Sequence, residues 1–304
     1  MRRALALAVE QGLGRDAAIL HNNLAFATWE HEGPAAALAL SGEGIELCER
    51  RGIAGIAFVV AAMRLTFLAA GGRSEDALAD ALPLAERAQT AGDAASLIEI
   101  HSVQLGLVGK RGGGAQAAAA AQLGATARET GEPQMMAQAF AAAAQLMLAD
   151  GHNEQAKALL EELERTSGNR DDTYYAAHLS ELVRCALALG NPALASRLIA
   201  GVEPRTPLQQ HALAASRAAL AEAAGDHTTA AVAYAEAAMR WRQFGDVPEL
   251  AYALLGQEHC LVALGTPGAD GPLSEARELF TAMGYAPALG ETDAMLQRAA
   301  APTS

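Results

Sequence analysis

The chain has 304 residues, of which 51% are hydrophobic and only 4% aromatic, so alanine and leucine supply most of the apolar side chains. This composition favours closely packed helices and argues against β-sandwiches and barrels, which are rich in Val, Ile, Thr and aromatic residues. It also excludes intrinsic disorder, which requires low hydrophobicity. The 22 basic and 35 acidic residues give a net charge of −13, so we expect no direct binding to nucleic acid and no association with membranes.

The first predicted helix, residues 2–11 (RRALALAVEQ), has the pattern of the second helix of a pair whose first helix is absent. Helical repeat arrays normally begin with a complete, polar-faced capping unit. We therefore expect the chain to be a piece of a longer protein.

Residues 53–72 are nearly long and apolar enough to span a bilayer. Arg64 lies near the middle of this stretch and would cost about 2.5–3.5 kcal/mol on insertion. The stretch also falls in phase with the repeat described next. We therefore predict a buried helix, with a membrane span as the alternative.

The cysteines give no sign of an oxidising compartment. Cys48, Cys185 and Cys260 are odd in number and too far apart for a disulfide framework or a zinc site. We expect them to be small buried residues of a cytoplasmic protein.

Two interleaved series of glycines recur along the chain at close to forty residues. One interval in the first series is twice as long, because a turn rich in proline at residues 201–207 replaces the glycine. The first series is Gly12, Gly52, Gly92, Gly131, Gly168, Gly245 and Gly284; the second is Gly33, Gly72, Gly112, Gly151, Gly190, Gly225 and Gly265. Such regularity predicts an internal repeat with two turns per period.

Between these turns the apolar residues follow a helical period, as in the Ala156, Leu159, Leu160 and Leu163 set. No segment alternates with the period of two that strands require. Asn191–Pro192 and Thr206–Pro207 have the pattern of helix N-caps, and Ser74, Asn153 and Asp226 are further candidates for that position.

We therefore predict an all-α fold, an α-solenoid of about seven antiparallel helix pairs. The pairs are expected to stack into a right-handed superhelix of about fifteen helices, with the first helix of each pair lining the inner face and a C-terminal helix closing the array. We expect one repeat domain over residues 1–304. Its predicted units are approximately 13–51, 52–91, 92–130, 131–167, 168–203, 204–244 and 245–283, with a cap at 284–300.

The repeats resemble the tetratricopeptide superfamily. The resemblance rests on Gly-Asp at 225–226 or Gly-Asn at 190–191, each placed between an apolar helix and an alanine-rich one. The period near 39 exceeds the standard 34 and is similar to the repeats of bacterial MalT/LuxR-type regulators and of ATPase-linked class III adenylate cyclases. Residues 244–255 and 275–284 resemble the last repeats of those proteins, and 289–299 their closing helix.

The sequence carries no complete catalytic motif. Residues 106–111 are the nearest match to a phosphate-binding loop, but they lack its spacing, its hydroxyl residue and its preceding strand. His259 and Cys260 are neighbours on a predicted helix, where adjacent side chains point about 100° apart. We therefore expect no enzymatic activity, no cofactor and no metal site, and treat an enzyme built from scattered residues as a remote alternative.

Histidines and other polar residues recur on the first helices of the predicted pairs. If these helices line a concave groove, their side chains would face a peptide or a small polar effector. The alternative for each single residue is a hydrogen bond between helices or a solvated surface. Trp29 and Trp241 are expected in packing rather than in recognition. The candidate groove residues are His21, Asn22, His101, Gln104, His178, Glu181, His211 and Gln257.

The resemblance implies that such an array is the sensor or partner-docking arm of a larger bacterial signalling or transcriptional regulator. In those families an ATPase module and an effector domain accompany the array, so an ATPase or cyclase module is expected in the parent chain. The first functional hypothesis is a non-catalytic scaffold that binds a protein or peptide partner in the groove. The alternative is a sensor domain that binds a small-molecule effector there.

Overall fold

The structure is a computed structural model and describes residues 1–114, 116–166, 168, 170, 172–266 and 271–300, without the side chains of 299 and 300. In this part of the chain every regular element is an α-helix, which confirms the all-α class predicted from the composition. The predicted unit boundary at residue 167 and the last four residues of the predicted domain, 301–304, lie outside the described residues.

Seventeen helices follow one another in the described chain. They are α1 (Arg2–Glu10), α2 (Gly14–Glu32), α3 (Pro34–Arg51), α4 (Ala54–Ala70), α5 (Ser74–Ala91), α6 (Ala94–Lys110), α7 (Ala117–Thr130), α8 (Pro133–Ala149), α9 (Asn153–Arg165), α10 (Thr173–Ala177), α11 (Leu179–Ala188), α12 (Pro192–Ile199), α13 (Pro207–Ala223), α14 (His227–Phe244), α15 (Val247–Ala263), α16 (Gly271–Met283) and α17 (Ala286–Ala300).

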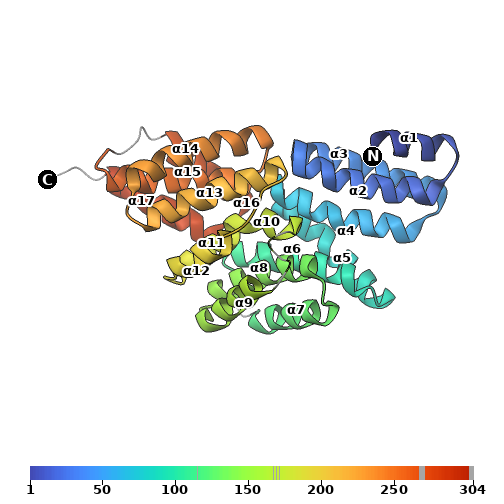
Figure 1. Cartoon of the computed structure of the whole chain (residues 1–304), viewed down its shortest axis with the longest axis horizontal. Coiled ribbons are helices and arrows are strands. Elements are labelled where there is room, and N and C mark those ends of the chain that lie inside the picture. Colours follow the sequence, from blue (N-terminus) through green and yellow to red (C-terminus); the bar gives the residue numbers. More distant parts are fainter. Residues whose placement is uncertain (115, 167, 169, 171, 267–270, 301–304) are drawn as a thin grey trace.

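Successive helices pack against each other in adjacent pairs, as α2 with α3, α13 with α14 and α14 with α15 do (Figure 1). The number of helices exceeds the expected fifteen for two reasons. Helix α1 is the unpaired N-terminal helix of the sequence pattern, and the segment 173–188 is divided at His178 into α10 and α11.

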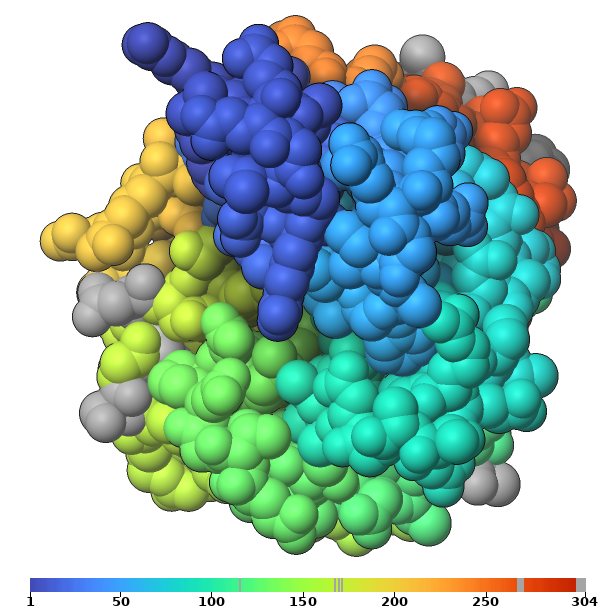
Figure 2. Space-filling view, turned by 90° about the vertical axis from the view of Figure 1, so that its right-hand side faces the viewer, coloured from blue at the N-terminus to red at the C-terminus, as the bar shows by residue number. Residues whose placement is uncertain are grey.

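The chain turns back on itself so that its two halves meet. In Figure 2 it passes clockwise from the blue N-terminal helices at the top, through cyan and green, to yellow at the left, and orange helices lie behind the blue ones. Helices far apart in the sequence are therefore in contact: α2 touches α13, α4 touches α15 and α6 touches α17.

At two of the turn glycines the halves approach each other closely. All fourteen glycines of the two series have φ between 67° and 92°, the left-handed region that glycine adopts without strain. A Cβ built on Gly33, between α2 and α3, would lie 1.9 Å from the carbonyl oxygen of Phe244. One on Gly72, between α4 and α5, would lie 2.8 Å from a methyl group of Val247.

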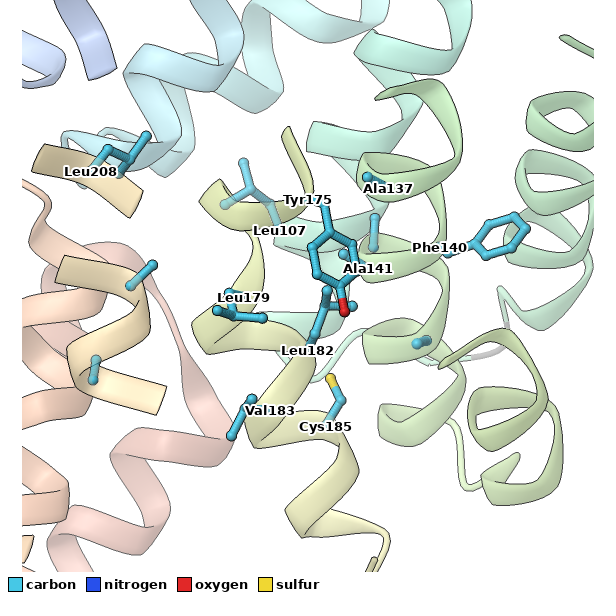
Figure 3. Packing of buried hydrophobic residues seen from close by; sticks show 14 of the residues in the cluster. Leu107, Ala137, Phe140, Ala141, Tyr175, Leu179, Leu182, Val183, Cys185 and Leu208 are labelled. Carbon is cyan, nitrogen blue, oxygen red and sulfur yellow. The ribbon is translucent and has the colours of Figure 1, made fainter. Parts of the chain in front are cut away.

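The main hydrophobic core extends from α2 to α17 and uses alanine to bring helices close, and a separate small cluster of Ala8, Ala17 and Leu47 lies at the N-terminal end. Figure 3 shows Tyr175 of α10 directed toward α8, where Ala137 and Ala141 lie, and Tyr175 is fully buried. Its hydroxyl donates to the carbonyl oxygen of Leu198 at 2.7 Å, so this buried polar group is satisfied.

The apolar stretch at 53–72 forms α4, which packs against α2, α3, α5, α6 and α15. Its Phe58, Leu65 and Phe67 are buried in the core, and Arg64 pairs with Asp80 of α5 at 3.2 Å. Among the helices that the structure describes, none has both the length and the hydrophobicity to cross a membrane.

Candidate functional site

A cavity of about 120 Å³ lies at the centre of the array, where the two halves of the chain meet. Side chains of α2, α4, α6, α8, α10, α11, α13, α14 and α15 and of the residue before α17 line it. An engineered apolar cavity of roughly 150 Å³ holds a benzene molecule, so this cavity suits a small organic molecule.

Aromatic side chains form much of the cavity wall. Both tryptophans of the chain, Trp29 and Trp241, line it and are 5% and 1% exposed. Their indole nitrogens are buried and have no hydrogen-bond acceptor among the residues that the structure describes. Tyr285 and Tyr174 complete the wall, and Tyr174 stacks on Phe26 with 4.8 Å between ring centroids.

A buried ion pair forms part of the polar side of the cavity. Lys110 Nζ, at the end of α6, lies 3.1 Å from Glu181 Oε1 of α11, and His178 Nδ1 lies 3.7 Å from Glu181 Oε2. Burial alone would lower the pKa of Lys110, but the carboxylate of Glu181, together with Tyr285 and Tyr252, outweighs it and raises that pKa. Burial would likewise raise the pKa of Glu181, and Lys110 with His178 holds it well below its usual range. Both groups of the Lys110–Glu181 pair are therefore charged.

A second buried pair lies beside the first and continues it toward α15. The guanidinium of Arg184, one turn after Glu181 on α11, donates to both carboxylate oxygens of Glu249, at 2.8 and 2.5 Å. The same guanidinium lies 4.3 Å from the ring centroid of Tyr252. Such bidentate geometry fixes the side chains more firmly than a single contact would.

Asp246 is the one acidic residue bordering the cavity for which the described residues show no ion pair. It is 6% exposed, and its carboxylate accepts a hydrogen bond from the backbone N–H of Glu249 at 3.1 Å, which caps α15. Burial, and then the charge of Glu249, raises the pKa of Asp246 to about 7. The cavity is therefore bordered by a carboxyl group that forms no ion pair within the described part of the chain.

Two of the eight residues predicted from the sequence, His178 and Glu181, line this cavity. His211 lies behind the wall, edge-on to Trp241 with 5.3 Å between ring centroids. His21 packs instead between α2 and α3, where a Cβ built on Gly44 would lie 3.1 Å from the Cβ of His21. Burial lowers the pKa of His21. The structure does not bring the predicted residues together into one site. Those that do not border the cavity are His21, Asn22, His101, Gln104, His211 and Gln257.

Most of the cavity residues were not predicted from the sequence, although the sequence contains some signals of them. Trp29 and Trp241 are the only tryptophans of the chain, and Lys110 is one of its two lysines. Both tryptophans are buried, as predicted, but they also form the cavity wall. Rare residue types that share a cavity are a stronger indication of a site than histidines that share a helix position.

A second polar cluster joins the last helices of the array. His259 of α15 lies between two carboxylates, with Nδ1 3.3 Å from Glu222 of α13 and Nε2 3.2 Å from Glu291 of α17. The hydroxyl of Tyr234 donates to the other oxygen of Glu222 at 2.7 Å. Burial would lower the pKa of His259, but the hydrogen bonds to Glu222 and Glu291 outweigh it and raise the pKa to about 9.

We predict that this cluster makes stability depend on pH above neutrality. Because the folded-state pKa exceeds the unfolded value near 6.5, the contribution is fully present below about pH 6.5 and is lost as the pH rises through about 9. The loss amounts to up to about 3 kcal/mol. Urea unfolding from pH 6 to pH 10 measures it, and His259→Gln should show a smaller decline over that range. Equal declines in the two proteins would show that His259 does not carry the effect.

No metal-ligand group of three or more His, Cys, Asp or Glu side chains occurs in the described part of the chain. The three cysteines are free and buried. No protein-family model matches the sequence, and no curated protein is significantly similar to it.

Proposed function

We propose that this chain is a sensor module that binds a small-molecule effector in its central cavity. The observation that carries the proposal is the composition of the cavity lining: aromatic walls, the buried Lys110–Glu181 pair, and the carboxyl groups of Glu249 and Asp246. Binding sites for small molecules have this combination of apolar walls and a few fixed polar groups.

The contacts between the two halves of the chain favour a small molecule over a peptide. An extended peptide needs a long continuous groove, whereas the cavity is a space of about 120 Å³ bordered by helices of both halves of the chain. A bound molecule would touch helices of both halves at once. It would therefore favour the closed arrangement over any arrangement in which the halves separate.

The proposed architecture is a right-handed, TPR-like α-solenoid closed on itself. The pairwise packing of successive helices and the left-handed turn glycines support it. We further propose that the module belongs to a larger bacterial regulator of the MalT/LuxR or adenylate cyclase type, in which binding in the cavity changes how a partner docks.

The proposal is tested by thermal-shift screening of metabolites against the wild-type chain and two phenylalanine variants. Ala70→Phe places a large side chain in the cavity, and Ala79→Phe is the matched change on the exposed face of α5. A ligand at a hundredfold excess over its Kd adds about 2.7 kcal/mol of stability. We expect it to raise the Tm of the wild type and Ala79→Phe but not of Ala70→Phe. The absence of any stabilising metabolite, or a shift retained in Ala70→Phe, would contradict the proposal.

A further inference from the structure

The polar groups of the cavity also indicate which class of molecule it binds, and this inference rests on the proposed function. The first indication is a shortage of acceptors on the tryptophan side. Indole N–H groups can only donate hydrogen bonds, and those of Trp29 and Trp241 have no acceptor among the described residues. A buried donor without a partner costs free energy, so these groups favour an occupant that carries acceptor atoms.

The second indication is a shortage of cations beside Asp246. Lys110 already faces Glu181, and Arg184 already holds Glu249. Neither cation forms an ion pair with Asp246, although the charge of each acts on it. A positively charged group in the cavity would supply the direct ion-pair partner that Asp246 does not find among the described residues.

The third indication is the balance of charge. Lys110 and Arg184 offset Glu181 and Glu249, so the two ion pairs together carry no net charge. A buried ion is costly unless it is paired. A purely anionic or purely cationic ligand would meet only one of these two requirements, that of the indole donors or that of the Asp246 carboxyl.

We propose that the cavity binds a small zwitterion of the amino-acid class. Its ammonium group would pair with Asp246, and its carboxylate would accept hydrogen bonds from the indole N–H groups and from the free protons of the Lys110 ammonium. Its hydrocarbon part would lie against the rings of Tyr174 and Tyr285. The volume of about 120 Å³ limits it to the size of an ordinary amino acid.

Isothermal titration calorimetry with matched probes tests this assignment. The probes are valine, leucine and phenylalanine, each with the amine and the carboxylic acid of the same skeleton; for leucine these are 3-methylbutylamine and 4-methylpentanoate. We expect at least one amino acid to bind, and both truncated partners to bind about tenfold or more weakly, because each loses a charged hydrogen-bonding group.

Asp246→Asn tests the position of the ammonium group. Asparagine caps helices as well as aspartate does, so α15 should keep its start while the negative charge is removed. Asp226→Asn is the matched control, because Asp226 caps α14 in the same way on the exposed surface. We expect Asp246→Asn to weaken binding of the amino acid about tenfold or more, and Asp226→Asn to leave it unchanged.

The outcomes separate this inference from the proposed function. If an amine or a carboxylate alone binds as tightly as the amino acid, and Ala70→Phe abolishes that binding, the cavity is a binding site and the zwitterion assignment is wrong. Equal binding by Asp246→Asn and the wild type would also overturn the assignment. If Ala70→Phe abolishes the binding of none of the probes and none of the screened metabolites, the proposed function itself is wrong.

Discussion

Replacing Gly33 by alanine is expected to lower the free energy of unfolding by about 3 kcal/mol or more. Gly33 has φ 92° and ψ 176°, a conformation that residues with a Cβ rarely adopt. The added methyl group would also lie 1.9 Å from the carbonyl oxygen of Phe244, so the contact between the two halves of the chain must open. Urea denaturation gives the stability change. Because both tryptophans line the cavity beside this contact, their fluorescence emission should shift as well.

Gly52→Ala is the control for this prediction. Gly52 follows α3 with φ 68°, but a Cβ there has open space around it. It therefore introduces backbone strain alone, about 1–2 kcal/mol, and no collision between the halves. Equal effects of Gly33→Ala and Gly52→Ala would mean that the contact with Phe244 contributes nothing to stability.

The positions of the helices could be predicted from the sequence because local chemistry decides them. The helix caps show this most clearly. Asn191, Thr206 and Asp226 accept hydrogen bonds from the backbone as predicted. Ser74 and Asn153 were predicted wrongly, because each is the first residue of its helix and makes no cap bond.

The wrong predictions have a physical reason: the geometry of the turn, and not the capping side chain, determines where the helix begins. In many turns of the array the residue directly after the left-handed glycine becomes the N-cap, whatever its type. Where that residue is aspartate or asparagine, its side chain also forms the cap bond; where it is Arg73 or His152, the helix begins without one. The glycine fixes the geometry, and the side chain only adds to it.

The cavity could not be predicted, because it depends on contacts that no repeat encodes by itself. The sequence period predicts that helix pairs follow one another. It does not predict which distant pairs come into contact after the chain has turned. The contact of α2 with α13, and of Gly33 with Phe244 at the end of α14, brings Trp29 and Trp241, more than 200 residues apart, to one cavity. The histidines were predicted to share a site because they occupy similar positions along their helices. Of these histidines only His178, between α10 and α11, lines the cavity.

The buried pair Lys110–Glu181 yields the second large effect. We expect Lys110→Met to lower the free energy of unfolding by about 3–5 kcal/mol, because it leaves the Glu181 carboxylate buried without its main countercharge. The side chains of the pair are only 17% and 13% exposed, so solvent screens them little. Lys157→Met is the matched control, since the only other lysine forms an exposed pair with Glu161 at 4.0 Å and should cost less than about 1 kcal/mol. Chemical denaturation of the two variants distinguishes them.

The double variant Lys110→Met, Glu181→Met distinguishes a role of the pair in ligand binding from a role in stabilising the fold. Replacing both members of a buried ion pair by apolar residues often restores or raises stability. We therefore expect the double variant to recover most of the stability that Lys110→Met loses, and yet to bind no zwitterion, because the ammonium that would receive the ligand carboxylate is gone. Recovery of stability without recovery of binding would mean that the pair is kept for the ligand. A double variant as unstable as Lys110→Met would instead mean that the charges hold α6 and α11 together, and the pair would then be structural.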